Sequence, residues 1–172
     1  MSPNLPTFLP TILPMSLSPT LPMFLPKFAA LLTLLSACAT AVAIDVPADA
    51  LKKAAAEKGA VVTPSGLVFV SLKEGTGASP AATDTVKVHY RGSFPTGGEF
   101  DSSYKRGEPT SFPLNRVIKC WTEGVQKIKV GGKAKLTCPS AIAYGERGAG
   151  GGEIPPNAVL QFEVELLEIT GK

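Results

Sequence analysis

The chain holds few residues that could attack a substrate or transfer a proton. A serine or cysteine nucleophile needs a base within hydrogen-bond reach, and the only histidine is His89. His89 lies with Lys87 and Arg91 on the polar face of an expected strand at 85–93, so we expect it to face water. No Gly-x-Ser-x-Gly elbow occurs either. The sequence therefore disfavours hydrolase chemistry.

A glycine-rich stretch at 145–153 could suggest a phosphate cradle. It lacks the Lys-Ser/Thr ending of a P-loop, and it continues into Ile154-Pro155-Pro156 instead of opening a helix. We interpret this stretch as a mobile loop beside a pocket and expect no nucleotide or other cofactor.

Composition further limits the kinds of protein and of partner that the chain can represent. The chain has 172 residues, a length typical of one domain, with 18% charged and 44% hydrophobic residues. The formal net charge is only +3 and no basic run stands out, so we expect no nucleic-acid partner. The three cysteines show none of the usual zinc spacings, and we expect no metal ion.

The elements that must position any site are short strands and one helix. Alternating apolar and polar residues predict strands at 67–73, 85–93, 133–139 and 159–165, separated by glycine and proline. Asn115 can cap a short helix whose apolar stripe is formed by Val117, Ile118, Trp121 and Val125. We therefore expect an α+β fold in which a twisted antiparallel sheet wraps around one short helix.

Residues 1–38 are typical of an export signal. A proline-rich leader precedes Lys27, a short apolar stretch and small residues. Leu35-Ser36-Ala37-Cys38 matches a bacterial lipobox, which makes Cys38 the candidate for lipidation, whereas Ala41-Val42-Ala43 fits a site that releases a soluble protein. Both cleavage sites remain open. The expected location is the periplasm or, through a lipid anchor only, the bacterial envelope.

Residues 39–60 are expected to form a tether before a domain at 61–172. Asp45 can cap and Pro47 can open a short helix through Ala54 to Lys58, and Gly59 can end it. Its apolar stripe is too thin for a strong dimerisation helix, so we expect a monomer.

Six segments, in order along the chain, resemble the FKBP-type peptidyl-prolyl cis-trans isomerases, especially bacterial exported members. The likeness runs from about Val61 to the C-terminus and implies the fold described above, with a shallow aromatic pocket between helix and sheet. It also implies proline-containing polypeptides as substrates and inhibition by macrolides such as tacrolimus and rapamycin. The matching segments are Val86–Gly92, Phe100–Ser103, Val117-Ile118 followed by Trp121–Gly124, Val130–Lys133, Ala143–Gly145, and Ile154–Ala158 with Phe162–Leu166.

The resemblance also assigns a pocket, with Trp121 as its floor. It implies that the Tyr144 hydroxyl and the Ile118 backbone amide hold the substrate carbonyl. Two departures stand out: Thr110 replaces a frequent aromatic residue, and the 145–153 loop has glycines where some members carry histidine. The candidate catalytic residues are Tyr90, Phe100, Asp101, Tyr144 and Phe162, and the candidate substrate-binding residues are Arg106, Phe112, Val117, Ile118, Trp121 and Ile154.

Two other functions fit the same residues. A non-catalytic chaperone or peptide-binding module could use the same groove without turnover, and the altered Thr110 is compatible with it. An inert envelope lipoprotein is favoured by the lipobox alone.

Cys120 and Cys138 occupy positions where many relatives carry glycine and an aliphatic residue. Cys138 shares the inward strand face with Leu136, and Cys120 precedes Trp121 on the helix that should pack there. A disulfide between them would close a loop of 18 residues and stabilise the domain by roughly 3 kcal/mol. The alternative is a pair of buried free thiols that act as small hydrophobic side chains.

Overall fold

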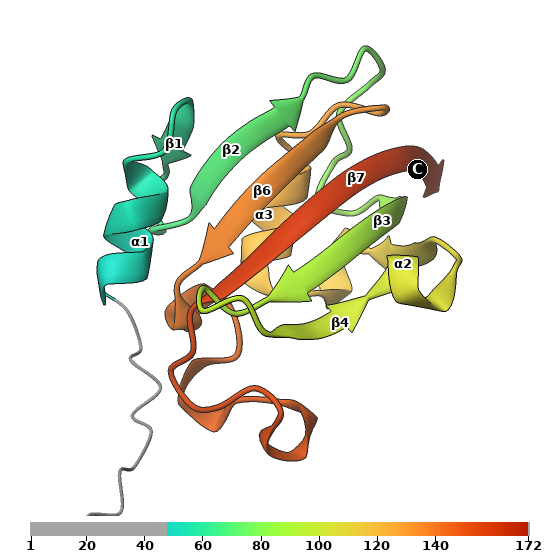
Figure 1. Cartoon of the computed structure of the whole chain (residues 1–172). Coiled ribbons are helices and arrows are strands. Elements are labelled where there is room, and N and C mark those ends of the chain that lie inside the picture. Colours follow the sequence, from blue (N-terminus) through green and yellow to red (C-terminus); the bar gives the residue numbers. More distant parts are fainter. Residues whose placement is uncertain (1–47, 172) are drawn as a thin grey trace, which may run out of the picture. The chain divides into compact units, whose positions relative to one another are not determined.

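The computed structural model describes residues 48–171, which contain a curved antiparallel sheet with helices packed against it (Figure 1). The proposed leader, the lipidation candidate Cys38 and the expected capping residues Asp45 and Pro47 lie outside the described residues. Within 48–171, no helix is long and apolar enough to cross a membrane.

The sheet has seven strands, and every pair among the described residues is antiparallel. Six follow the spatial order β1-β2-β6-β7-β3-β4, and β5 pairs with β3 beside β4. The expected α+β class, a sheet wrapped around one short helix, is confirmed. The strands are β1 (Ala60–Val62), β2 (Val68–Lys73), β3 (Thr85–Ser93), β4 (Glu99–Ser102), β5 (Thr110–Pro113), β6 (Lys133–Cys138) and β7 (Leu160–Gly171).

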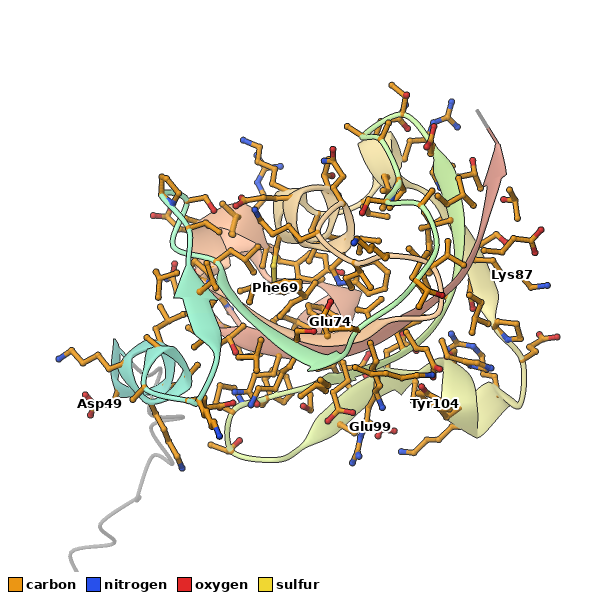
Figure 2. All side chains as sticks on the ribbon, turned by 90° about the horizontal axis from the view of Figure 1, so that it is seen from above. Asp49, Phe69, Glu74, Lys87, Glu99 and Tyr104 are labelled. Carbon is orange, nitrogen blue, oxygen red and sulfur yellow. A yellow bond between two sulfur atoms is a disulfide. The ribbon has the colours of Figure 1, made fainter. Side chains whose placement is uncertain are left out.

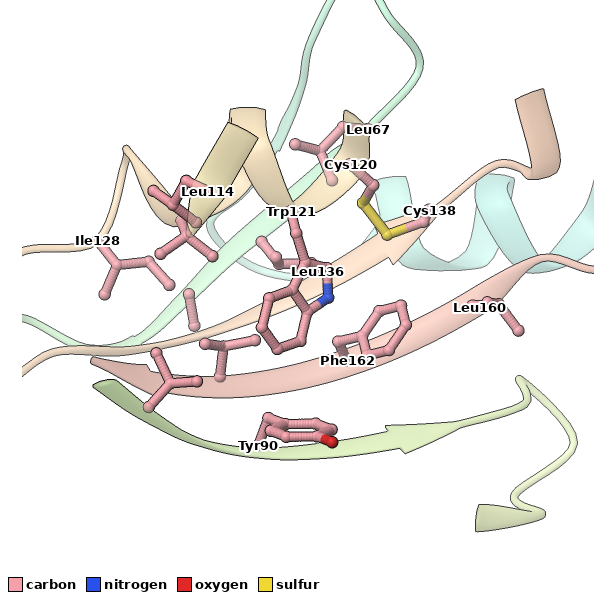
Figure 3. Close-up of a cluster of buried hydrophobic side chains, with 14 of the residues drawn as sticks. Leu67, Tyr90, Leu114, Cys120, Trp121, Ile128, Leu136, Cys138, Leu160 and Phe162 are labelled. Atoms are coloured by element: carbon pink, nitrogen blue, oxygen red, sulfur yellow. A yellow bond between two sulfur atoms is a disulfide. The ribbon is translucent and has the colours of Figure 1, made fainter. Parts of the chain in front are cut away.

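The concave face of the sheet carries the main core. Alternation turns every second side chain of a strand to this face, where helix α3 (Lys119–Val125) covers it. Figure 3 shows Trp121 extending from α3 toward the sheet, with Phe162 of β7 beside its ring and Tyr90 of β3 below it. Gly124 brings the helix close, since a Cβ there would lie 2.7 Å from Leu136 of β6. The sheet and α3 therefore pack without a gap at this point.

Helix α3 begins later than the sequence suggested. Asn115 lies in a 3-10 turn, Leu114–Arg116, and does not cap α3, which begins at Lys119 after extended residues Val117 and Ile118. The Thr122 hydroxyl donates to the Leu114 carbonyl at 2.6 Å, which ties the turn to the helix. The expected apolar stripe is therefore split, and Val117 and Ile118 belong to the approach to the helix.

The expected tether forms part of the folded unit. Helix α1 (Ala48–Ala55) contacts β1, β2 and β6, and its Ala50 and Ala54 are buried. An ion pair of 2.5 Å between Glu57 and Lys135 joins the segment that follows α1 to strand β6. The helix ends at Ala55, before the expected Lys58. Small alanines allow this close packing without a broad apolar stripe.

His89 does not simply face water. It is half-buried, its ring stacks on Tyr104 with centroids 4.7 Å apart, and Nδ1 lies 3.0 Å from the buried Ser103 hydroxyl. Ser103 and Tyr104 belong to α2 (Ser103–Arg106), a short helix that the sequence analysis did not predict. Figure 2 places Tyr104 and Glu99 on the outer side of the sheet, away from Phe69 on the inner side.

The two sulfur atoms of Cys120 and Cys138 are joined in the structure as a disulfide, with Cα atoms 5.9 Å apart. Both residues are fully buried. The bond links the first turn of α3 to the end of β6, directly before Trp121 (Figure 3).

Candidate active site

A pocket of about 540 Å³ lies where α3, the concave face of the sheet and the 145–154 loop meet. Its wall combines aromatic rings from the four strands β3, β4, β5 and β7, residues at the start of α3, and residues of the loop. The lining residues are Tyr90, Phe100, Asp101, Phe112, Arg116, Val117, Ile118, Trp121, Tyr144, Ala149, Gly150, Glu153, Ile154 and Phe162.

Trp121 is the centre of the aromatic wall. Its ring makes edge-on contacts with Tyr90, Phe112 and Phe162, with centroids 5.2, 5.5 and 5.5 Å away. Phe100 adds an edge-on contact with Phe162 at 5.6 Å. Edge-on packing of this kind holds each ring at a fixed angle. The result is a rigid apolar surface on which a small ring can rest.

Gly92 makes room for two of these rings. It lies opposite Asp101 on one side and opposite Phe162 on the other, in the centre of the sheet. A Cβ at this position would lie 2.6 Å from the ring of Phe100 and 3.1 Å from that of Phe162. The backbone of β3 can therefore approach the pocket only because this residue lacks a side chain.

A polar network borders the aromatic wall. The Tyr90 hydroxyl donates to Asp101 Oδ2, Arg106 Nη1 donates to Asp101 Oδ1 at 2.5 Å, and Arg106 Nη2 donates to the Tyr90 oxygen at 2.8 Å. Arg106 also reaches Thr110 at 3.4 Å. The Thr110 hydroxyl, at a position where the chain departs from the family pattern, thus joins the network.

The protonation state of this network follows from its contacts. Burial acts to raise the pKa of Asp101, but hydrogen bonds from Tyr90 and Arg106 and the charge of Arg106 outweigh it and hold the pKa below its ordinary value. Burial raises the pKa of Tyr90, and its bond to Asp101 adds to this effect. At neutral pH the site therefore contains an ionised carboxylate and a neutral phenol.

Tyr144 and Ile118 offer hydrogen-bond donors to the pocket. Burial raises the pKa of Tyr144, with a smaller contribution from the negative charge of Asp101, so its hydroxyl stays protonated at neutral pH. Ile118 immediately precedes α3, in extended conformation, and its carbonyl accepts from Trp121 and Thr122. Among the bonds found between described residues, none is donated by the Tyr144 hydroxyl or the Ile118 amide. Both donors are thus available to a bound molecule.

The 145–154 loop is more ordered than a mobile glycine loop. Ala149 and Ile154 exchange two backbone hydrogen bonds of 3.0 Å, and Asn157 donates to the Gly145 carbonyl at 2.8 Å. Gly148 has a positive φ of 63°, and a Cβ there would lie 2.1 Å from the Ile154 oxygen. These bonds hold the loop so that it forms one wall of the pocket.

Ten of the eleven candidate catalytic and substrate-binding residues line the pocket. Arg106 does not line it but is bonded to Tyr90 and Asp101, which do. Four further lining residues, Arg116, Ala149, Gly150 and Glu153, were not among the candidates. Arg116 and Glu153 directly precede the predicted Val117 and Ile154, so adjacency was the available signal. No group of three or more potential metal ligands occurs within 48–171.

Comparison with known proteins gives one consistent family. Residues 77–167 match the family described as FKBP-type peptidyl-prolyl cis-trans isomerase. The chain is 58% identical over 115 residues to the FKBP-type peptidyl-prolyl cis-trans isomerase FkpA of Aeromonas hydrophila, an alignment covering 67% of this chain and 42% of that protein. The chain thus spans less than half the length of that relative.

Solved structures of the same family superpose on the chain. The crystal structure of FkpA from Escherichia coli superposes with a TM-score of 0.67 at 49% identity, over 70% of this chain and 56% of that one. A peptidyl-prolyl cis-trans isomerase from Pseudomonas syringae superposes with a TM-score of 0.66 at 36% identity, over 70% of this chain and 88% of that one.

Proposed function

This chain belongs to the FKBP-type peptidyl-prolyl cis-trans isomerases, and we propose that it accelerates rotation about Xaa-Pro peptide bonds and so assists the folding of other proteins. The observation that carries the proposal is the aromatic pocket on the Trp121 ring, bordered by donors that are free to bind a carbonyl.

The pocket favours the twisted state of the amide. The barrier to rotation, about 18–20 kcal/mol, arises from resonance that places negative charge on oxygen and positive charge on nitrogen. Twisting the bond removes this dipole. A wall of Trp121, Phe112 and Phe162 solvates the planar dipolar amide less well than water does, so it lowers the relative free energy of the twisted state. Each tenfold acceleration requires about 1.4 kcal/mol.

The polar groups orient the substrate. The Tyr144 hydroxyl and the Ile118 amide hold substrate carbonyls, which keeps the prolyl ring against Trp121 while the bond turns. Arg106 and Asp101 fix the Tyr90 ring, which forms the side of the pocket. No proton transfer is required.

Refolding of a denatured protein whose slow phase is limited by one proline tests this function. The complete chain should shorten that phase at a small fraction of the substrate concentration, because an isomerase turns over. A module that only holds unfolded chains would need equimolar amounts and would slow the phase. That result would replace the isomerase with the chaperone alternative.

Inhibition and oligomeric state belong to the same proposal. Macrolides of the tacrolimus and rapamycin type occupy the Trp121 pocket and compete with proline-containing polypeptides. The chain acts as a monomer, which is supported by α1, because its Ala50 and Ala54 are already covered by the sheet. Competition between macrolide and peptide, and sedimentation at equilibrium, test these two points.

We also propose that the protein is exported to the periplasm or anchored in the envelope by a lipid on Cys38. The support is the signal layout from Lys27 to Cys38. Labelling of cells with a fatty acid should mark the wild-type protein and leave Cys38→Ala unlabelled. Unlipidated mature protein that begins at Ile44 would favour the other cleavage site.

A further inference from the structure

Two charged side chains of the pocket have no part in the mechanism above. Arg116 ends the 3-10 turn before α3, and Glu153 lies in the 145–154 loop. Both side chains line the pocket and both are exposed to solvent. They therefore lie at its edge, where the residues on either side of a bound proline must leave the pocket.

These two charges are available to a substrate. The other charge in the pocket wall, Asp101, is already bonded to Arg106 and Tyr90. Among the ion pairs found between described residues, none includes Arg116 or Glu153, and the two do not pair with each other. The pocket thus presents one free cation and one free anion among the residues that the structure describes.

The backbone at both positions is fixed although the side chains are exposed. The Leu114 amide donates to the Asp84 carbonyl at 2.9 Å, which holds the turn that carries Arg116. The paired Ala149 and Ile154 hold the loop that carries Glu153. The two charges come from separate segments, so a substrate chain crossing the pocket can meet them at separate points.

We propose that Arg116 and Glu153 select proline segments with opposite charges on the two sides of the proline. This inference rests on the proposed isomerase function and names the substrates that the pocket prefers. When the substrate chain runs in one direction, its carboxylate lies near Arg116 and its ammonium group near Glu153, so both are attracted. When the charges of the substrate are exchanged, each group lies near a like charge, and both are repelled. Because both side chains are exposed, the discrimination is about three- to tenfold and weakens with salt.

Three blocked peptides test the proposal: Ala-Glu-Pro-Lys-Ala, Ala-Lys-Pro-Glu-Ala and the neutral Ala-Gln-Pro-Gln-Ala. Exchange between cis and trans forms is followed by NMR with the complete chain, which avoids the preference of a coupling protease. One dipolar peptide should be exchanged with a kcat/KM about three- to tenfold above that of the other, and 0.5 M salt should reduce the ratio.

Charge reversal provides the decisive comparison. The double variant Arg116→Glu/Glu153→Arg should invert the order of the two dipolar peptides, a result that does not depend on its overall activity. Lys119→Gln removes an exposed charge three residues after Arg116, and Glu146→Gln removes one from the loop that carries Glu153, both at positions that do not line the pocket. These controls should retain the wild-type ratio.

Equal rates for the two dipolar peptides with the wild-type chain would overturn the inference, as would a ratio that the double variant leaves unchanged. In either case, accelerated exchange of the neutral peptide would leave the isomerase function intact. Absence of acceleration for all three peptides would contradict the function itself, and with it this inference.

Discussion

Gly92 of β3 lies opposite Phe162 of β7, and its missing side chain leaves space for the aromatic wall of the pocket. We predict that Gly92→Ala lowers catalysis on the order of tenfold, because the new Cβ must displace the Phe100 ring, 2.6 Å away, at a cost of about 1–3 kcal/mol. Gly98→Ala is the matched control, since its Cβ would make only an ordinary contact of 3.5 Å with Phe94. Equal activities of the two variants would contradict this role for Gly92.

The Asp101 network predicts a pH dependence of stability. The pKa of Asp101 is lowered in the folded protein, so its ionised form stabilises the fold at pH values above the unfolded pKa of about 3.9. This contribution is lost as the pH falls through the folded pKa.

Urea denaturation of wild type and Asp101→Asn should therefore show a difference in the free energy of unfolding that is constant above about pH 5 and shrinks below about pH 4. A difference that is the same at every pH would show that the Asp101 carboxylate is not linked to folding.

Tyr144→Phe removes one hydroxyl from the pocket and leaves the ring. Catalysis should fall by roughly tenfold, equivalent to a hydrogen bond of about 1.4 kcal/mol, and the urea midpoint should stay near that of wild type. Unchanged kcat/KM in this variant would remove Tyr144 from the groups that hold the carbonyl.

Trp121→Ala should behave differently, because Trp121 is buried and contacts three other rings. We expect a loss of about 3–5 kcal/mol in the free energy of unfolding together with loss of activity. A variant that kept wild-type stability would show that Trp121 is not the packed floor of the pocket.

The bond between Cys120 and Cys138 should stabilise the protein by roughly 3 kcal/mol. The double variant Cys120→Ala/Cys138→Ala should therefore unfold at a lower urea concentration than the oxidised wild type, and a reducing agent should affect only the wild type. Two free thiols in the denatured, oxidised wild-type protein would show that the bond does not form.

The sequence predicted the four longer strands, β2, β3, β6 and β7, well, and it predicted neither the short strands β1, β4 and β5 nor α2. In β7, Leu160, Phe162 and Val164 alternate with charged and polar residues, so the pattern alone identifies the buried face. The strand nevertheless continues to Gly171, six residues past the predicted end, because pairing with β3 supports it there. Edge strands such as β5 are too short for any periodicity.

Contacts between residues apart in the sequence account for the other differences between the predicted and the observed elements. The start of α3 depends on the bond from Thr122 to Leu114, which no local signal for a helix start reveals. Helix α2 did have such signals: Ser102 accepts from the Lys105 amide, and Gly107 ends the helix at a φ of 76°. Arg116 and Glu153 reach the pocket only because separate segments meet there.

The central claim is that the Trp121 pocket accelerates rotation about an Xaa-Pro bond. Cis-trans exchange of a neutral proline peptide, measured by NMR against increasing concentrations of the complete chain, tests it most directly. The account predicts a rate that rises in proportion to the protein and returns to the uncatalysed value when rapamycin is added. Exchange that stays at the uncatalysed tens to hundreds of seconds, even at high protein concentration, would contradict it.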